Sequence, residues 1–154
     1  MIELLTGKDI RASLTDLINE KAGIPYDVYF NHVNKSDTSY VWVNMSARKQ
    51  SWDEVYFQRI IDVDIQVILF PDTYANVKHT DLWDISDALT QAIMPCLKIK
   101  DRFITVQDFH SDIVDDVLHY EFSLDFTDYV RSAKYEGAEY ELMMNLELNL
   151  NEDV

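Results

Sequence analysis

Glycine, proline and cysteine are scarce in this 154-residue chain, which has three glycines, three prolines and one cysteine. A single cysteine excludes an intrachain disulfide, and the place of Cys96 beside Pro95 after an apolar segment predicts a buried, inert thiol. Three glycines leave little material for a phosphate-binding loop, and the Gly-x-Ser-x-Gly elbow of serine hydrolases is absent. The sequence therefore predicts no catalytic residue and no cofactor.

Basic residues are few as well, with 13 lysines and arginines against 28 aspartates and glutamates and a formal net charge of −15. Such a charge repels nucleic-acid phosphates and anionic membrane surfaces, which argues against tight DNA binding and against a membrane partner. The acidity has two interpretations. It either keeps the protein soluble or provides a surface that does not hold DNA passing close by.

Long apolar runs are missing too. The longest, Val67–Phe70, is too short to span a bilayer, and Met1–Leu5 lacks the basic start and apolar stretch of a signal peptide. We therefore expect a protein that is cytosolic when made. Its length and its 47% content of hydrophobic residues predict one domain with a substantial core.

Two segments have the apolar spacing of helices. The first is predicted from Gly7 to Ala22, with a capping box at Thr6–Asp9 and a stop at Gly23, which tolerates the left-handed conformation. The second is predicted from about residue 81 to residue 94. Thr80 is the candidate N-cap of this helix, and Pro95 follows the end of the helix.

Alternating apolar and polar residues predict five strands. Three precede the second helix, at 26–31, 40–43 and 55–70, with Arg48–Ser51 expected to break the second of them. Two more, around a charged turn, are predicted between Leu97 and Tyr129. The order α-β-β-β-α-β-β predicts an α+β fold, in which a mostly antiparallel sheet has two helices packed on one face.

The last stretch differs from the rest. We expect an α+β domain over residues 1–130 and an acidic C-terminal arm over residues 131–154. Leu146, Leu148 and Leu150 alternate with polar residues in the arm. The arm is either a free acidic tail or a strand that pairs with a sheet edge of a neighbouring subunit, and the alternation favours the strand.

The densest group of potential metal ligands lies between His110 and His119 and contains the residues His110, Asp112, Asp115, Asp116 and His119. The spacing of a zinc site is absent, and carboxylate-rich turns are ordinary in so acidic a chain. A small metal-binding or hydrolytic domain that uses these residues is therefore an alternative, not the preferred interpretation. A monomeric protein-binding adaptor is another alternative.

Three strings point to a family: Asp9-Ile10-Arg11, the run 62–67 ahead of Phe70-Pro71, and Ile113 to His119 before the final strand. With the order of elements, they make residues from about Ile10 to Tyr129 similar to the phage tail terminator family. Asp116 stands where that pattern leads us to expect glycine.

The resemblance implies a non-enzymatic structural protein of the virion tail, made in the cytoplasm of the host bacterium. It implies a ring, commonly a hexamer, that caps the head-proximal end of the tail tube and stops its growth. The implied partners are further copies of the chain, the tail tube protein, the head-tail connector or stopper, and possibly the tail sheath. DNA would pass through the ring without specific binding.

Interface residues are expected in loops that project from the sheet and in the C-terminal arm, because such segments are free to bind. The candidates are Lys35, Ser36, Asp37, Arg48, Lys49, Trp52, Tyr74, His79, Leu146, Leu148 and Leu150.

Overall fold

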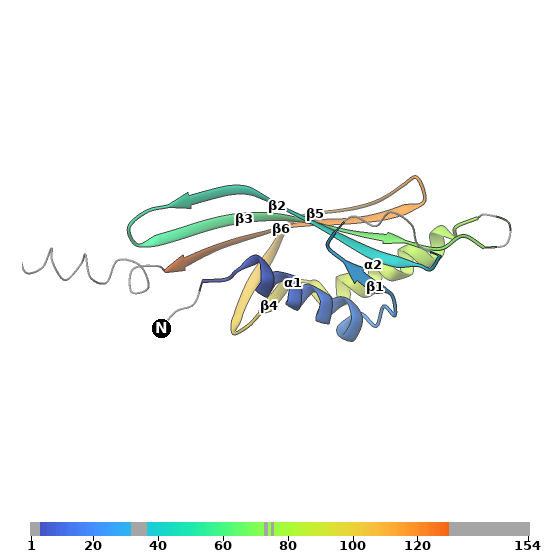
Figure 1. Ribbon diagram of the computed structural model, residues 1–154, viewed down its shortest axis with the longest axis horizontal. Coiled ribbons are helices and arrows are strands. Elements are labelled where there is room, and N and C mark those ends of the chain that lie inside the picture. Colours follow the sequence, from blue (N-terminus) through green and yellow to red (C-terminus); the bar gives the residue numbers. More distant parts are fainter. Residues whose placement is uncertain (1–3, 32–36, 73, 75, 130–154) are drawn as a thin grey trace, which may run out of the picture.

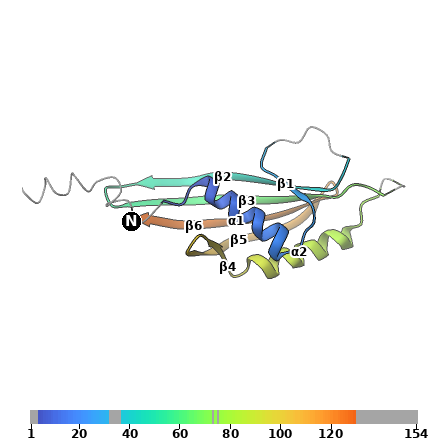
Figure 2. The same ribbon diagram turned by 60° about the horizontal axis from the view of Figure 1, so that its bottom comes forward.

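The computed structural model describes residues 4–31, 37–72, 74 and 76–129, which form a six-stranded sheet with helices on one face (Figure 1). The predicted α+β class is confirmed, and both helices lie on the same side of the sheet (Figure 2). The elements are, in chain order, α1 (Gly7–Asp16), a π-helical turn (Leu17–Lys21), β1 (Asp27–Tyr29), β2 (Tyr40–Trp52), β3 (Tyr56–Ile68), α2 (His79–Ile93), β4 (Cys96–Ile99), β5 (Arg102–Val114) and β6 (Val117–Tyr129).

The first helix begins at the predicted capping box. The Thr6 hydroxyl accepts a hydrogen bond from the Asp9 backbone N–H at 3.2 Å, and the Asp9 carboxylate accepts one from the Thr6 N–H at 2.9 Å. The Thr6 N–H, more than the nearby Lys100 ammonium, lowers the pKa of Asp9. The predicted helix continues through the π-helical turn, and Gly23 follows it with a φ of 68°.

The two central strands, β3 and β6, carry the core. Their inward residues face each other in register at Val63 and Phe122, Ile65 and Tyr120, and Val67 and Leu118. These residues are buried beneath apolar side chains from the helices, which include Ile10, Leu14, Leu82, Leu89 and Ile93. Burial on this face of the sheet supplies most of the favourable free energy of folding.

Tyr120 joins this core to α2. Its hydroxyl lies 3.0 Å from the Thr90 hydroxyl. Burial raises the pKa of Tyr120, and the hydrogen bond with Thr90 partly opposes that increase. The phenol therefore stays neutral and hydrogen-bonded inside the apolar layer.

The sheet is mixed, so the predicted mostly antiparallel arrangement holds except at one edge. The strand order is β1-β2-β3-β6-β5-β4, and β1 runs parallel to β2 while the other pairs are antiparallel. Asp27, the first residue of β1, pairs with Tyr40, the first residue of β2. After β1 the chain must therefore return to the end of the sheet at which β1 began.

The predicted order of elements was wrong by one strand. The segment from Leu97 to Tyr129 holds three strands, because β4 and β5 form a hairpin around Lys100, whose φ is 54°. A lysine in the left-handed region gives no glycine signal for such a turn. The predicted charged turn lies at Asp115–Asp116, between β5 and β6.

The predicted break at Arg48–Ser51 was also wrong, because β2 continues to Trp52. Gln50 and Ser51 pair with Arg59 and Gln58 of β3, and a bulge between Ala47 and Lys49 accommodates one extra residue. Pairing with a long neighbouring strand overrides the weak strand preference of these polar residues.

The start of the second helix was predicted slightly too late. Helix α2 begins at His79, and its N-cap position is held by Lys78, whose side chain makes no capping hydrogen bond. Thr80 therefore lies inside the helix and is not the cap.

The turn between β5 and β6 has positive φ at both central residues, 51° at Asp115 and 61° at Asp116. Left-handed backbone costs most residues roughly 1–2 kcal/mol and costs glycine almost nothing. We expect Asp115→Gly to raise the free energy of unfolding by about 0.5–1 kcal/mol. Urea unfolding followed by circular dichroism measures the change. Asp112→Gly, in the extended part of β5, is the control and should destabilise; equal effects of both changes would contradict the turn assignment.

Candidate assembly interface

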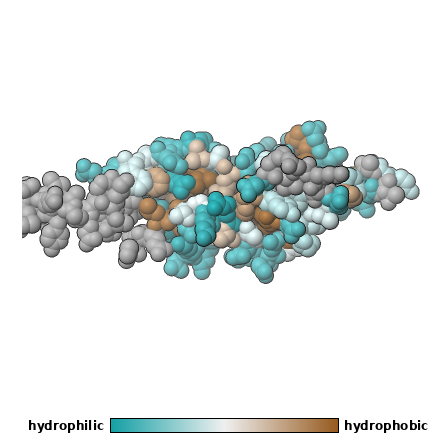
Figure 3. All heavy atoms as spheres, viewed as in Figure 1, coloured by the Kyte–Doolittle hydropathy of each residue, from teal (hydrophilic) through white to brown (hydrophobic). Residues whose placement is uncertain are grey.

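The face of the sheet opposite the helices is polar. Its central positions alternate with the core residues along β3 and β6, and they are the residues Asp62, Asp64, Gln66, His119, Glu121, Ser123 and Asp125. No described helix covers this side (Figures 1 and 2). Hydrophilic residues also dominate the described surface visible in Figure 3. We call this side the open face.

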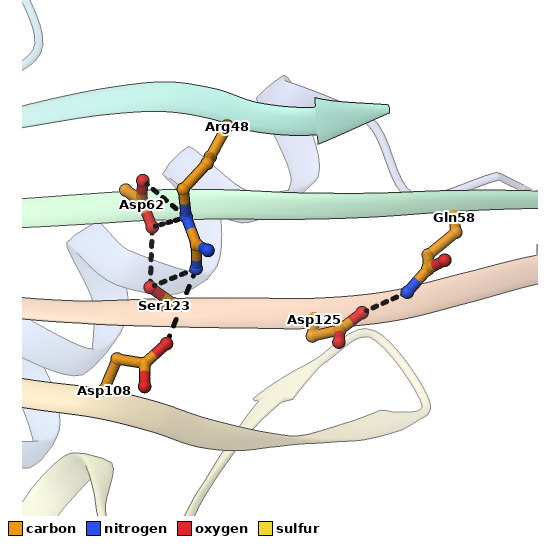
Figure 4. A network of polar contacts seen from close by, with 6 residues as sticks. All are labelled: Arg48, Gln58, Asp62, Asp108, Ser123 and Asp125. Atoms are coloured by element: carbon orange, nitrogen blue, oxygen red, sulfur yellow. Dashed lines mark hydrogen bonds and ion pairs between the residues drawn. The ribbon is translucent and has the colours of Figure 1, made fainter. Parts of the chain in front are cut away.

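Arg48 links the four long strands across the open face (Figure 4). Its Nε lies 3.2 Å from both carboxylate oxygens of Asp62, and its Nη2 donates to the Ser123 hydroxyl at 3.3 Å and contacts Asp108 at 3.5 Å. Ser123 in turn donates to Asp62 at 2.6 Å. Because Asp108 is on β5 and Arg48 is on β2, this one side chain spans β3 and β6.

Bulges make that span possible. Arg48 is the extra residue of the β2 bulge, and Asp108, with a φ of 53°, lies in the irregular part of β5 between Gln107 and His110. A bulge re-aims side chains at the point where it interrupts a ladder. The guanidinium thereby offsets part of the repulsion between carboxylates on this face.

A second group on the open face contains Asp64, His119 and Glu121, whose potential ligand atoms lie within 4.8 Å of one another. The Oδ2 atom of Asp64 lies 3.2 Å from Nδ1 of His119 and accepts from the Gln66 amide at 2.9 Å. The other oxygen of Asp64, Oδ1, is buried without a hydrogen-bond partner among the described residues. This is the described group with the geometry to hold a metal ion.

Of the predicted ligand cluster, only His119 belongs to this group. His110 lies opposite Glu121 and Asp112 lies opposite His119 in the ladder, whereas Asp115 is in the turn. The neighbouring Asp116 contacts His79 at 2.8 Å. Sequence reasoning missed Asp64 because the register of β3 against β6 brings it beside His119 from a distant part of the chain.

The predicted interface residues are distributed over separate parts of the molecule. Asp37, Lys49 and Tyr74 are exposed, Trp52 packs on Phe57 with ring centroids 4.4 Å apart, and the places of Arg48 and His79 are given above. Figure 1 places the β2–β3 hairpin and the start of α2 toward opposite ends of the long axis. Five candidates lie outside the described residues: Lys35, Ser36, Leu146, Leu148 and Leu150.

The sheet also has two lateral edges, and part of the strand at each edge has no partner in the described chain. β1 covers only residues 40–42 of β2, and β4 covers only residues 102–105 of β5. Unpaired strand edges are templates for pairing with another chain. None of the described helices has the length and apolar character needed to cross a membrane.

A polar sheet face and partly unpaired strand edges are features through which a small α+β domain can contact other chains. The comparison with family models makes this specific: residues 9–136, most of the chain, match the model described as phage tail terminator protein. The chain therefore belongs to the phage tail terminator family, a structural family of tail proteins. No curated protein matches it.

Removal of the Arg48 guanidinium tests the network. We expect Arg48→Ala to lower the free energy of unfolding by up to about 1 kcal/mol, since the Arg48 side chain is 51% exposed and solvent screens its ion pairs. The loss should shrink in high salt. Arg48→Lys keeps the charge but lacks the planar guanidinium, so its free energy of unfolding should lie between those of the wild type and Arg48→Ala. Urea unfolding at low and high salt measures these values; a loss of the same size in high salt would contradict an electrostatic role.

The metal-binding alternative is tested separately. We expect the purified protein to hold less than one divalent metal ion per chain, because Asp64 Oδ2 already accepts from Gln66 and lies against His119. Elemental analysis after dialysis, and thermal unfolding with and without a chelator, give the measurement. A stoichiometric metal that is lost in His119→Ala but retained in His110→Ala would establish the site and contradict this expectation.

Proposed function

We propose that the protein forms a ring, a hexamer, on the head-proximal end of a phage tail tube. The ring ends growth of the tube and offers a docking face to the head connector. The membership of residues 9–136 in the tail terminator family carries this proposal. The fold supports it, because a domain with unpaired strand edges on both sides of one sheet can contact a neighbour on each side.

The open face is the side that lines the central hole in this proposal. It carries more carboxylates than cations, with Asp62, Asp64 and Glu121 around the single guanidinium of Arg48. An acidic wall repels DNA phosphates and so lets DNA move through without being held. The helices then lie on the outside of the ring.

The dimensions agree with passage of DNA. The four long strands β2, β3, β5 and β6 of each copy would make a wall of about 24 strands in a hexamer. At a spacing of about 4.8 Å and the usual tilt of barrel strands, such a wall encloses a hole of roughly 40–50 Å between backbones. Side chains narrow this hole, and a duplex still fits.

The tail tube protein and the head connector are the partners of this ring, with the tail sheath as a further partner if the tail is contractile. The loop residue Tyr74, 83% exposed, follows the end of β3, and Asp37 precedes the start of β2, where Tyr40 pairs with Ile68 at the end of the ladder away from the β2–β3 hairpin. We propose that one end of the ring meets the tube and the other meets the connector. The C-terminal arm, residues 131–154, adds contacts between neighbouring copies.

Electron microscopy tests the proposed function directly. The purified full-length chain is imaged alone and after mixing with tail tubes that lack their cap. We expect annular particles, tube ends closed by one extra ring of density, and no further elongation when tube protein is added. A chain that leaves tube ends bare and tube growth unchanged would refute the proposal.

A further inference from the structure

The two partly unpaired edges of the sheet lie on opposite sides and differ in charge. On one side, residues 43–52 of β2 have no strand beside them among the described residues, because β1 pairs only with residues 40–42. On the other side, residues 107–114 of β5 extend past the hairpin with β4. We infer that these edges pair with each other between copies: β2 of one subunit lies beside β5 of the next, in one continuous sheet.

Strand direction supports this pairing. β2 is antiparallel to β3, β3 to β6, and β6 to β5, so β2 and β5 of one chain run in opposite directions. In a ring whose axis runs along the strands, the rotation that relates one copy to the next leaves the strand directions unchanged. β5 of the next copy therefore lies antiparallel to β2 of the first. The pairing is head to tail, which closes into a ring when the rotation returns to its start. This inference rests on the proposed function and specifies its lateral contact.

Charge supports it as well. Lys49, on the exposed β2 edge, makes no ion pair with any described residue, and Arg48 lies next to it. The β5 edge carries Asp112, which accepts only from the N–H of the next residue, and Asp115 follows in the turn and makes no described hydrogen bond. The basic edge and the acidic edge thus retain charges that the isolated chain leaves unpaired, as complementary interfaces require.

The apolar residues of the two edges also match. On β2, Trp52 is 42% exposed, and on β5, Phe109 is 47% exposed. In the antiparallel arrangement that brings Asp112 level with Lys49, Phe109 comes level with Trp52, three residues farther along each strand.

Charge exchange provides the first test. In Lys49→Glu, two negative edges meet, and we expect at least a tenfold loss of ring formation, measured by analytical ultracentrifugation and by capping of tube ends. Asp112→Lys should do the same. The double variant, Lys49→Glu with Asp112→Lys, restores opposite charges at every junction and should restore the ring. Lys8→Glu on α1 and Asp87→Lys on α2 repeat each charge change on the exposed helical side and should leave assembly unchanged.

Cross-linking provides the second test. In a Cys96→Ser chain, Lys49→Cys on β2 is combined in turn with His110→Cys, Asp112→Cys or Val114→Cys on β5, all of which are exposed. Mild oxidation should convert at least one pair into covalent multimers up to the closed ring, whereas each single cysteine yields dimers at most.

The outcomes separate the two proposals. If wild-type chains form no ring alone or on tubes, the proposed function fails. If wild-type rings form, yet Lys49→Glu and Asp112→Lys assemble normally and no pair cross-links, the ring stands and the edge pairing is refuted. The edge charges then serve only to block indiscriminate strand pairing.

Discussion

The structure depends on the pairing of β3 with β6. The two strands are in register along their full length, from Tyr56 opposite Tyr129 to Ile68 opposite Val117. Because side chains alternate, one register decides both faces together: it buries Val63 against Phe122 beneath the helices and sets Asp64 beside Glu121 on the other side. A slip of one residue would exchange the core for the open face. The acidic surface is therefore fixed by the same contacts that hold the core together.

The placement of both helices on one side follows from this division. Since only one face of the central strands is apolar, α1 and α2 can bury their apolar stripes only there. The other face is left to Arg48 and its acidic partners, which keep a half-exposed polar surface ordered without a covering layer. A sheet of this kind suits the wall of a channel, with one side packed and the other wet. The family supplies the biological setting, and the open face supplies the chemistry proposed for DNA passage.

Local signals in the sequence predicted much of this fold. The capping box at Thr6, the left-handed Gly23 and the alternation along β6 each correspond to an observed feature, because each depends on residues close together in the chain. The failures came where non-glycine residues take unusual backbone conformations. Lys100 has a positive φ, so the hairpin between β4 and β5 was missed. The extension of β2 past Arg48 depends on pairing with β3, which no local pattern reveals.

The candidate interface was harder to predict. Arg48 and Lys49 were selected as loop residues, yet they belong to a strand, and their neighbours on the open face come from β3, β5 and β6. The grouping of Asp64 with His119 likewise required the strand register. Sequence patterns indicated which residues are polar and exposed, whereas only the sheet showed which of them share a surface. The family resemblance rested on strings spread along the chain and is confirmed by the match over residues 9–136.

Hydrogen exchange on the assembled protein is the most direct measurement of how copies of the chain contact one another. Backbone amides are compared between the free chain and the chain bound on tube ends. Edge pairing predicts slower exchange on assembly in residues 43–52 and 107–114, with little change on the exposed sides of α1 and α2. Slower exchange confined to the helices, with both strand edges unchanged, would contradict it.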